Sequence, residues 1–196
     1  MEYECVKCGY KNAVDAQECV ACKWPLAIEA WERSKHRISK VTKDSSCVNA
    51  KQQHTALNQL EEWEKQGQIH LQGAEELRKE AQGSFQQAKA EATKPLPTNF
   101  FILGSSSLNG GDIFAGPEIW GQLRAILFPT VAELNDNQMS DVNHLAQHVR
   151  SGGDAFITRD TNFMKDRKQE TLRRYGIWVF HPEELVALFR QLHKWD

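Results

Sequence analysis

The sequence predicts an α/β fold with a mainly parallel central sheet, preceded by a small cysteine-rich module at the N-terminus. In the last third of the chain, short apolar stretches alternate with amphipathic stretches, and strands that alternate with helices imply a parallel sheet. Near the N-terminus, four of the five cysteines form two Cys-x-x-Cys pairs. A length of 196 residues provides for one medium domain and one small appended module.

Composition and charge restrict the classes of partner. The formal net charge is −2, so a nucleic-acid partner would have to be met by a local basic patch rather than by global attraction. No apolar run approaches the roughly 18 residues that a membrane span requires, and the N-terminus lacks the basic and apolar regions of a signal peptide. We therefore expect a soluble cytoplasmic protein without a membrane partner. The oligomeric state stays open, with a homodimer as one expectation.

The paired cysteines at the N-terminus predict a zinc site. Cys5 and Cys8 are separated from Cys19 and Cys22 by ten residues, and in a reducing compartment this pattern is typical of metal ligands. Two such pairs can surround Zn²⁺ tetrahedrally at about 2.3 Å. A segment of about 25 residues buries too little apolar surface to fold alone, so the metal would supply its folding energy. Two disulfides or a redox pair are the alternatives.

Residues 1–26 resemble the small zinc ribbons that bacterial and archaeal proteins carry at a terminus. The spacing, with Asn12 between the cysteine pairs, is also similar to Ran-binding-protein-type zinc fingers, some of which bind single-stranded RNA or ubiquitin. Those fingers usually carry Trp where this chain has Tyr3, which favours the ribbon. The module would then contact RNA or a protein, or serve only as a structural unit. The candidates for stacking on bases are Tyr3, Tyr10 and Trp24, and those for contacting phosphates are Lys7, Lys11 and Lys23.

After the module, the patterns are weak at first. Residues 27–37 are expected to form a short helix or a linker, and residues 38–42 a polar strand that ends at Asp44. Leu57, Leu60 and Trp63 recur at helical spacing until Gly67. The following expected elements are a strand at 69–71, a helix at 74–81, a polar stretch at 82–99, a buried patch or short strand at 100–103, a flexible loop at 104–111 and a helix at 119–127.

The last third has the clearest patterns. Ser140 is expected to cap a helix that ends at the pair Gly152 and Gly153, and residues 155–158 form the next strand. A helix at 165–175 leads to a strand at 177–180. Pro182 then opens the final helix, whose first turn carries acidic residues.

The segment from Asp141 through Thr158-Arg159-Asp160 to Gly176-Ile-Trp-Val and Pro182-Glu-Glu-Leu resembles the PIN domain, a family of metal-dependent nucleases. The resemblance covers residues 38–192, and its specific part is residues 140–188. It implies a PIN-like three-layer sandwich over 38–196, with a polar insertion around 82–118. It also implies four clustered acids, which are Asp44, Glu76 (with Glu75 as the alternative), Asp141 and Asp160.

The chemistry of RNA cleavage explains why such acids would gather. Hydrolysis of a phosphodiester requires a deprotonated water and stabilisation of growing negative charge, and carboxylate-bound Mg²⁺ or Mn²⁺ supplies both. These ions prefer oxygen ligands and keep several waters. By resemblance, the chain is expected to cleave single-stranded RNA, with Thr158 or Ser45 orienting a metal-bound water. A non-catalytic PIN-like adaptor that binds RNA or protein is the alternative, and a toxin of the toxin–antitoxin kind is a third.

Single residues in this set also have simpler interpretations. The negative charge of Asp141 would simply complement the positive N-terminal end of its helix dipole. Asp160 would be an ordinary N-cap residue in a loop. His144 and His148 are four apart, as in some metal sites, but such histidines are more often partly buried. Cys47 is expected to be a small buried residue rather than a nucleophile. Six basic residues against three acidic ones lie between 159 and 174, and the candidates for contacting RNA are Arg159, Lys165, Lys168 and Arg173.

Overall fold

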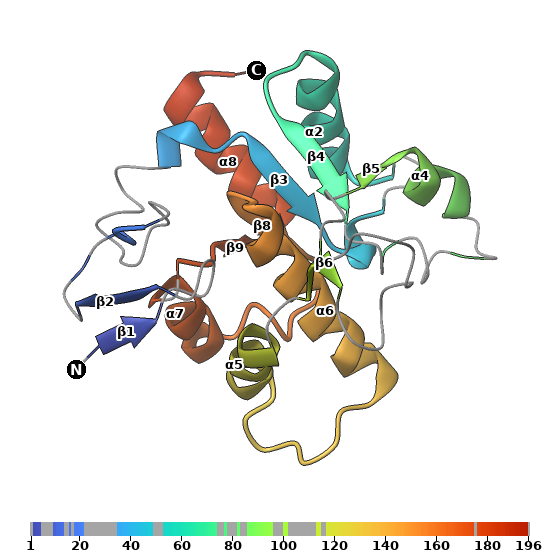
Figure 1. Cartoon of the computed structure of the whole chain (residues 1–196). Coiled ribbons are helices and arrows are strands. Elements are labelled where there is room, and N and C mark those ends of the chain that lie inside the picture. Colours follow the sequence, from blue (N-terminus) through green and yellow to red (C-terminus); the bar gives the residue numbers. More distant parts are fainter. Residues whose placement is uncertain are drawn as a thin grey trace.

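A five-stranded sheet lies at the centre of the computed structural model, with helices on both of its faces (Figure 1). The structure describes residues 2–4, 10–13, 16, 18–21, 35–48, 53–73, 77, 82, 86–95, 100–101, 113–114, 117–174 and 176–195. The strands are β1 Glu2–Glu4, β2 Lys11–Ala13, β3 Lys40–Lys43, β4 His70–Gly73, β5 Lys94–Pro95, β6 Phe100–Phe101, β7 Ile113–Phe114, β8 Ala155–Ile157 and β9 Val179–Phe180. The helices are α2 Thr55–Lys65, α4 Gln87–Ala92, α5 Pro117–Leu127, α6 Asp136–Ser151, α7 Asp166–Arg174 and α8 Pro182–His193, together with the 3-10 helices η1 Lys35–Arg37 and η2 Ser45–Cys47.

All strand pairs of the central sheet are parallel, in the order β5-β4-β3-β8-β9. The chain first builds outward from β3 through β4 to β5, and it then returns to the other side of β3 for β8 and β9. The predicted α/β class with a parallel sheet is confirmed. Because the direction of building reverses between β3 and β8, the carboxyl ends of these two strands form the switch point where ligands usually bind in open α/β sheets.

Two apolar cores separate the sheet from its helical layers. On one face, Trp63 of α2 and Phe189 of α8 pack edge to face, with ring centroids 5.7 Å apart, over strand residues that include Ile157. On the other face, α5, α6 and α7 bury Leu145 and its neighbours against Phe156. Successive residues of β8 therefore enter opposite cores, as strand geometry requires. The result is a three-layer arrangement of helices, sheet and helices.

Most predicted elements match the described ones, but the predicted start of α6 is wrong. The helix begins at Asp136, and its cap is Asn135 rather than Ser140. The Asn135 side chain accepts from the Gln138 backbone N–H at 2.9 Å, and the Gln138 side chain accepts from the Asn135 N–H at 3.1 Å. Asp141 therefore lies in the second turn and is not a first-turn residue that complements the helix dipole. The apolar periodicity missed the first turn because its residues are largely exposed.

The stretch expected to be an insertion contributes to the central sheet. Its helix α4 and strand β5 have no apolar periodicity, and β5 pairs with β4 through Lys94 and Pro95. Within the same stretch, β6 and β7 form a separate parallel pair, so the short-strand alternative at Phe100 is correct. The elements expected at 27–34 and 104–111 lie outside the described residues, as does the helix at 74–81 apart from Leu77, which is helical. Among the helices that the structure describes, none has the length and apolarity to cross a bilayer.

The start of β3 is fixed to the start of β8 by the Asp154 side chain. Asp154 Oδ2 accepts from the backbone N–H groups of Ser39 and Lys40 at 2.9 and 2.8 Å. In the other direction, the Asp154 N–H donates to the Lys40 carbonyl at 2.8 Å. These contacts join the two central strands at the amino edge of the sheet, across more than a hundred residues of sequence.

Two adjacent glycines follow α6 for different reasons. Gly152 has a φ of 69° and ends the helix in the left-handed conformation. Gly153 is buried against the hydrogen bond between His148 Nδ1 and Thr42 Oγ1, which spans 2.8 Å. A Cβ on Gly153 would lie 2.3 Å from that Nδ1 and 2.8 Å from that Oγ1. The second glycine therefore permits α6 to approach β3.

We expect Gly153→Ala to lower the free energy of unfolding by about 2 kcal/mol or more, because the methyl group displaces two buried hydrogen-bonded side chains. The matched control is Gly121→Ala in α5, where a Cβ meets nothing within 4 Å. That change should raise stability by up to about 1 kcal/mol through helix propensity. Urea unfolding of the three proteins measures both effects, and equal destabilisation by the two alanines would contradict the crowding at Gly153.

Candidate functional site

The candidate site lies at the switch point, at the carboxyl ends of β3 and β8. Strand alternation directs Thr42 and Asp44 toward α6, and it directs Phe156 and Thr158 to the same face of the sheet. Asp44 immediately follows β3, and Thr158 immediately follows β8. The Asp44 N–H donates to the Ile157 carbonyl at 3.0 Å, so the two strand ends remain in register beyond the last paired residues.

The Asp44 carboxylate is the best-connected buried acid among the described residues. Its Oδ1 lies 2.7 Å from His144 Nδ1, and its Oδ2 accepts from the hydroxyls of Ser46 at 2.6 Å and Thr158 at 2.8 Å. Burial alone would raise the pKa of Asp44, but the hydrogen bond and charge of His144, with the two hydroxyls, lower it to about 2. Because an ionised carboxylate only accepts, His144 Nδ1 carries the proton that they share.

Helix α6 runs antiparallel to β3 and contacts it at matched intervals. His144 meets Asp44, and one helical turn later His148 meets Thr42, two residues back along the strand. Four helical residues advance about 6 Å and two strand residues about 6.6 Å, so the two rows of side chains stay aligned. Asp141 lies three residues before His144, or about 4.5 Å farther along the axis. Its position is therefore beyond the end of β3, above the carboxyl edge of the sheet.

Asp160 is held next to this cluster by a short relay of hydrogen bonds. Its backbone N–H donates to Thr158 Oγ1 at 3.0 Å, and that hydroxyl in turn donates to Asp44. The Asp160 carboxylate is half-buried, and its Oδ1 accepts from the Asn162 backbone N–H at 2.8 Å. Thr158 therefore couples the position of Asp160 to that of the buried acid.

Lys168 of α7 links Asp141 to Asp160. Burial lowers the pKa of Lys168 below its usual range and Lys165 adds to this effect, while the negative charges of Asp160 and Asp141 oppose it. The Lys168 Nζ also lies 5.0 Å from the centroid of the Phe128 ring, within cation–π range. The charges of two acids that are 19 positions apart in sequence therefore both act on this half-buried cation.

The structure brings together some of the predicted acids and supports. Asp44 and Thr158 are in direct contact, Asp160 is coupled to them through Thr158, and the charges of Asp141 and Asp160 both act on Lys168. Ser46 holds Asp44 and also accepts from the Arg159 backbone N–H at 2.9 Å, whereas the role expected for Ser45, orienting a metal-bound water, stays a prediction. Glu75 and Glu76 lie outside the described residues.

The described acids, Asp44, Asp141 and Asp160, offer the carboxylate oxygens that magnesium and manganese ions prefer, but they do not form a complete set of metal ligands. Within the described part of the chain, no group of three or more His, Cys, Asp or Glu side chains is arranged to hold a metal ion. Mg²⁺, however, keeps several waters and is commonly held by one or two carboxylates together with substrate phosphates. Two carboxylates, Asp141 and Asp160, are candidates for such a site near the buried charge of Asp44.

The predicted RNA-contacting residues differ in exposure. Arg159, Lys165 and Arg173 are exposed, whereas Lys168 is half-buried beside the acids. The histidines proved to be buried side chains that hydrogen-bond to β3, in agreement with the simpler interpretation of their spacing. Sequence reasoning missed the roles of Ser46 and His144 as partners of Asp44. The four-residue spacing of the two histidines was the available signal, although it does not reveal which strand residues they contact.

Cys47 is buried, as predicted. Burial raises the pKa of its thiol to about 12, and the negative charge of Asp44 adds to this effect. Its Sγ donates to the Ile157 carbonyl at 3.5 Å.

Lys43, the last residue of β3, points to the opposite face of the sheet from Asp44. Burial lowers the pKa of Lys43, while the charges of Glu61 and Glu64 of α2 act against this effect.

Part of the predicted zinc module is described. Strands β1 and β2 form an antiparallel hairpin, and Cys5 and Cys8 fall in the segment that connects them. Asn12 is buried, donates to Cys19 Sγ at 3.7 Å and accepts from the Val20 N–H at 3.0 Å, so it fixes the turn that carries Cys19. Cys5, Cys8 and Cys22 lie outside the described residues. Tyr10 is 48% exposed, as a base-stacking residue would be.

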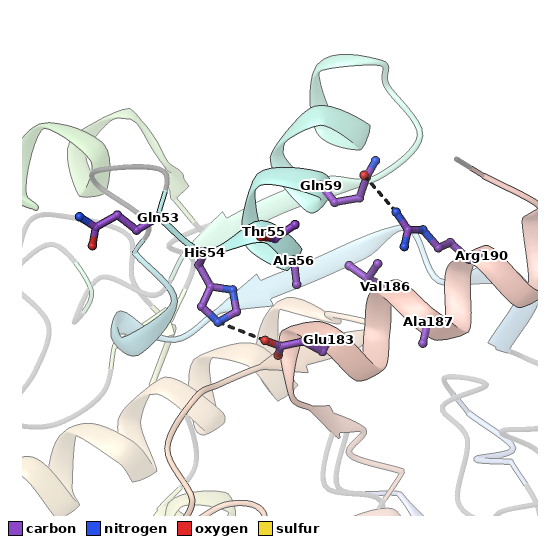
Figure 2. Close-up of a pocket in the computed structure, with 9 residues that line it drawn as sticks. All are labelled: Gln53, His54, Thr55, Ala56, Gln59, Glu183, Val186, Ala187 and Arg190. Carbon is purple, nitrogen blue, oxygen red and sulfur yellow. Dashed lines mark hydrogen bonds and ion pairs between the residues drawn. The ribbon is translucent and has the colours of Figure 1, made fainter.

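A separate pocket lies between α2 and α8, and we call it the α2–α8 pocket (Figure 2). Its volume is about 550 Å³. His54 and Glu183 close one end of it, and Gln59 and Arg190 bridge the helices at the other end. The residues that line it are Gln53, His54, Thr55, Ala56, Gln59, Glu183, Val186, Ala187 and Arg190. None of the acids around Lys168 contributes to this pocket.

Comparisons of the chain with models of protein families, with curated proteins and with solved structures found no match.

The buried Asp44 predicts a specific loss of stability in acid. Because its pKa is lowered from 3.8 to about 2, its contribution is fully present above about pH 4 and disappears as the pH falls toward 2. The contribution should be about 2 kcal/mol. We expect urea unfolding of the wild type between pH 4 and 2 to show this loss. Asp44→Asn should be less stable at pH 7 and should lack this part of the acid dependence, and a variant that retains it in full would contradict the assignment.

Proposed function

We propose that this protein is a metal-dependent endoribonuclease of PIN type that cleaves single-stranded RNA. The observation that carries the proposal is the arrangement at the switch point, where the buried Asp44 is coupled through Thr158 to Asp160 and where the His144–Asp44 contact sets α6 so that Asp141 lies beyond the end of β3. The order of these residues in the chain agrees with the resemblance to PIN nucleases described above.

Each side chain has a defined part in this proposal. Asp141 and Asp160 would hold Mg²⁺ or Mn²⁺, which, when bound, supplies an activated water and stabilises negative charge on the phosphate. Asp44 keeps the site negative without moving, because His144, Ser46 and Thr158 fix it. Thr158 orients the Asp160 backbone.

Basic side chains would position the RNA around these acids. The ammonium of Lys168, on which the charges of Asp141 and Asp160 act, would contact a phosphate of the bound strand. The exposed Arg159, Lys165 and Arg173 would follow the RNA backbone.

A second candidate function is a non-catalytic adaptor that binds RNA or protein. Two observations favour it. Both Asp44 oxygens already accept hydrogen bonds, and the described residues contain no group of three potential metal ligands. In this alternative, the N-terminal module recruits the partner, and the acids keep only their structural role.

In both cases we propose that Cys5, Cys8, Cys19 and Cys22 bind a structural zinc ion. The buried Cys19 sulfur that accepts from Asn12, together with the hairpin that carries the first cysteine pair, supports this assignment. The exposed Tyr10 and Lys11 on this module would provide RNA or protein contacts.

Nuclease activity is tested by incubating the protein with single-stranded RNA and Mn²⁺. Asp160→Asn and Asp141→Asn should each reduce the cleavage rate about 100-fold or more, because each removes a charged metal ligand, and EDTA should abolish cleavage. The matched control is Asp136→Asn, an exposed acid at the start of the same helix as Asp141, which should cleave like the wild type. Equal cleavage by wild type and Asp160→Asn would assign the activity to a contaminant, whereas RNA binding without turnover would favour the adaptor.

The zinc assignment predicts that Cys19→Ser lowers the zinc content of the purified protein and weakens its association with RNA, because one of four thiolate ligands is lost. Cys47→Ala is the control, since Cys47 lies in the main domain beside Asp44 and should leave the zinc content unchanged. Elemental analysis gives the metal content, and a Cys19→Ser protein with the full zinc content would refute the site.

A further inference from the structure

We propose that the α2–α8 pocket binds a single ribonucleotide, with the phosphate at Arg190 and the sugar or base at Glu183. The pocket volume of about 550 Å³ lies within the usual range for small-molecule sites. Its two ends carry opposite charge, and its floor is apolar. This combination suits a ligand with an anionic group at one end, an apolar ring in the middle and hydrogen-bond donors at the other end.

Arg190 provides the cationic end. Its Nη2 donates to Gln59 Oε1 at 3.4 Å, the only hydrogen bond of this side chain among the described residues. That distance is long for a hydrogen bond, and a guanidinium group has five N–H donors. Most of its capacity is therefore available to a ligand. A planar, permanently charged fork is well suited to two phosphate oxygens.

Glu183 provides the acceptor end. Burial raises the pKa of its carboxyl, but its own backbone N–H, the hydrogen bond from His181 and the charges of His181 and His54 lower it overall, so Glu183 stays ionised. His54 Nε2 lies 3.2 Å from Glu183 Oε1, and His181 Nδ1 contacts the other oxygen. A carboxylate fixed in this way accepts hydrogen bonds from hydroxyl or amino groups of a ligand, so the uncharged sugar or base suits this end of the pocket better than the phosphate does.

The floor between these ends is formed by small aliphatic side chains. Ala56 and Val186 are buried, and Ala187 is exposed at the edge of the pocket. Figure 2 shows Ala56 and Val186 between the His54–Glu183 contact and the Gln59–Arg190 contact. A flat ring can lie on such a surface, and the Gln59 carboxamide, which accepts from Arg190, lies at the Arg190 end of it.

The distance between the ends favours a nucleotide over shorter dipolar ligands. Glu183 and Arg190 are seven residues apart on α8, which corresponds to about 10 Å along the helix axis. A free amino acid carries both of its backbone charges on groups bonded to one Cα, and inorganic phosphate is a single small anion. Neither spans the pocket, whereas the phosphate and the base of a nucleotide are separated by the ribose.

The His54–Glu183 end of the pocket lies at the N-terminal ends of α2 and α8, on the same edge of the sheet as the proposed nuclease site. Helix α8 begins directly after β9, and α2 follows the segment after β3, so the N-terminal ends of both helices lie at the carboxyl edge (Figure 1). The ligand class rests on the pocket alone. If the ribonucleotide is part of an RNA strand, the pocket is a second contact for the substrate, and this extension rests on the proposed function.

The test is a calorimetric titration of the full-length protein with adenosine, cytidine, guanosine and uridine 5′-monophosphates in EDTA, so that the proposed metal site plays no part. We expect at least one nucleotide to bind, the matching nucleoside and inorganic phosphate to bind much more weakly, and Arg190→Ala to weaken nucleotide binding at least about tenfold. Arg37→Ala, at an exposed arginine outside the pocket, is the control and should bind like the wild type.

A second variant separates loss of the pocket from loss of the fold. Ala187→Trp adds a large ring at an exposed helical position that lines the pocket, and it should abolish binding while thermal unfolding stays close to that of the wild type. If an oligoribonucleotide binds more tightly than the monophosphates and its binding depends on Arg190, the natural ligand of the pocket is a nucleotide within an RNA strand. If the oligoribonucleotide binds more weakly, the natural ligand is a free nucleotide. The proposal is overturned if no ribonucleotide or oligoribonucleotide binds, or if Arg190→Ala and Ala187→Trp leave binding unchanged. These results do not depend on RNA cleavage, so the two proposals fail separately.

Discussion

The structure depends on one buried carboxylate at the centre of the sheet edge. Asp44 ends the strand that all other strands of the sheet are built around, and burying its charge is favourable only because three side chains from η2, β8 and α6 hydrogen-bond to it. The same contacts fix the depth of α6 against the sheet, and with it the position of Asp141. A single electrostatic requirement therefore organises both the fold at the switch point and the proposed catalytic acids.

The two central strands are braced at both ends by acids with different surroundings. At the amino edge, Asp154 binds backbone N–H groups of the segment that enters β3. At the carboxyl edge, Asp44 binds side chains instead, so that its position depends on the identity of neighbouring residues. The first brace tolerates many sequences around it, whereas the second specifies Ser46, Thr158 and His144. This difference explains why the motif-rich end of the sheet is also its most sequence-dependent part.

The α/β class and most elements of the last third could be predicted because their apolar periods are long and their boundaries carry Gly or Pro. Strand β5 could not, since Lys94 and Pro95 have no apolar pattern and only pairing with β4 makes them a strand. The acids could be selected from their order in the chain. That Ser46 is the serine whose hydroxyl bonds to Asp44 depends on the turn of η2, which the sequence does not reveal. The α2–α8 pocket left no local signal, because its walls come from helices more than a hundred residues apart.

Strand β5 also has a consequence for self-association. It forms one edge of the central sheet, where unpaired backbone groups of a longer strand would offer a template for another chain. In the part of the chain that the structure describes, this edge consists of Lys94 and Pro95, both exposed, of which Pro95 lacks an N–H and Lys94 carries a charge. Such an edge disfavours intermolecular strand addition, which protects against aggregation from this side. Any dimer of this chain would therefore have to join through other surfaces than a continuous sheet across β5.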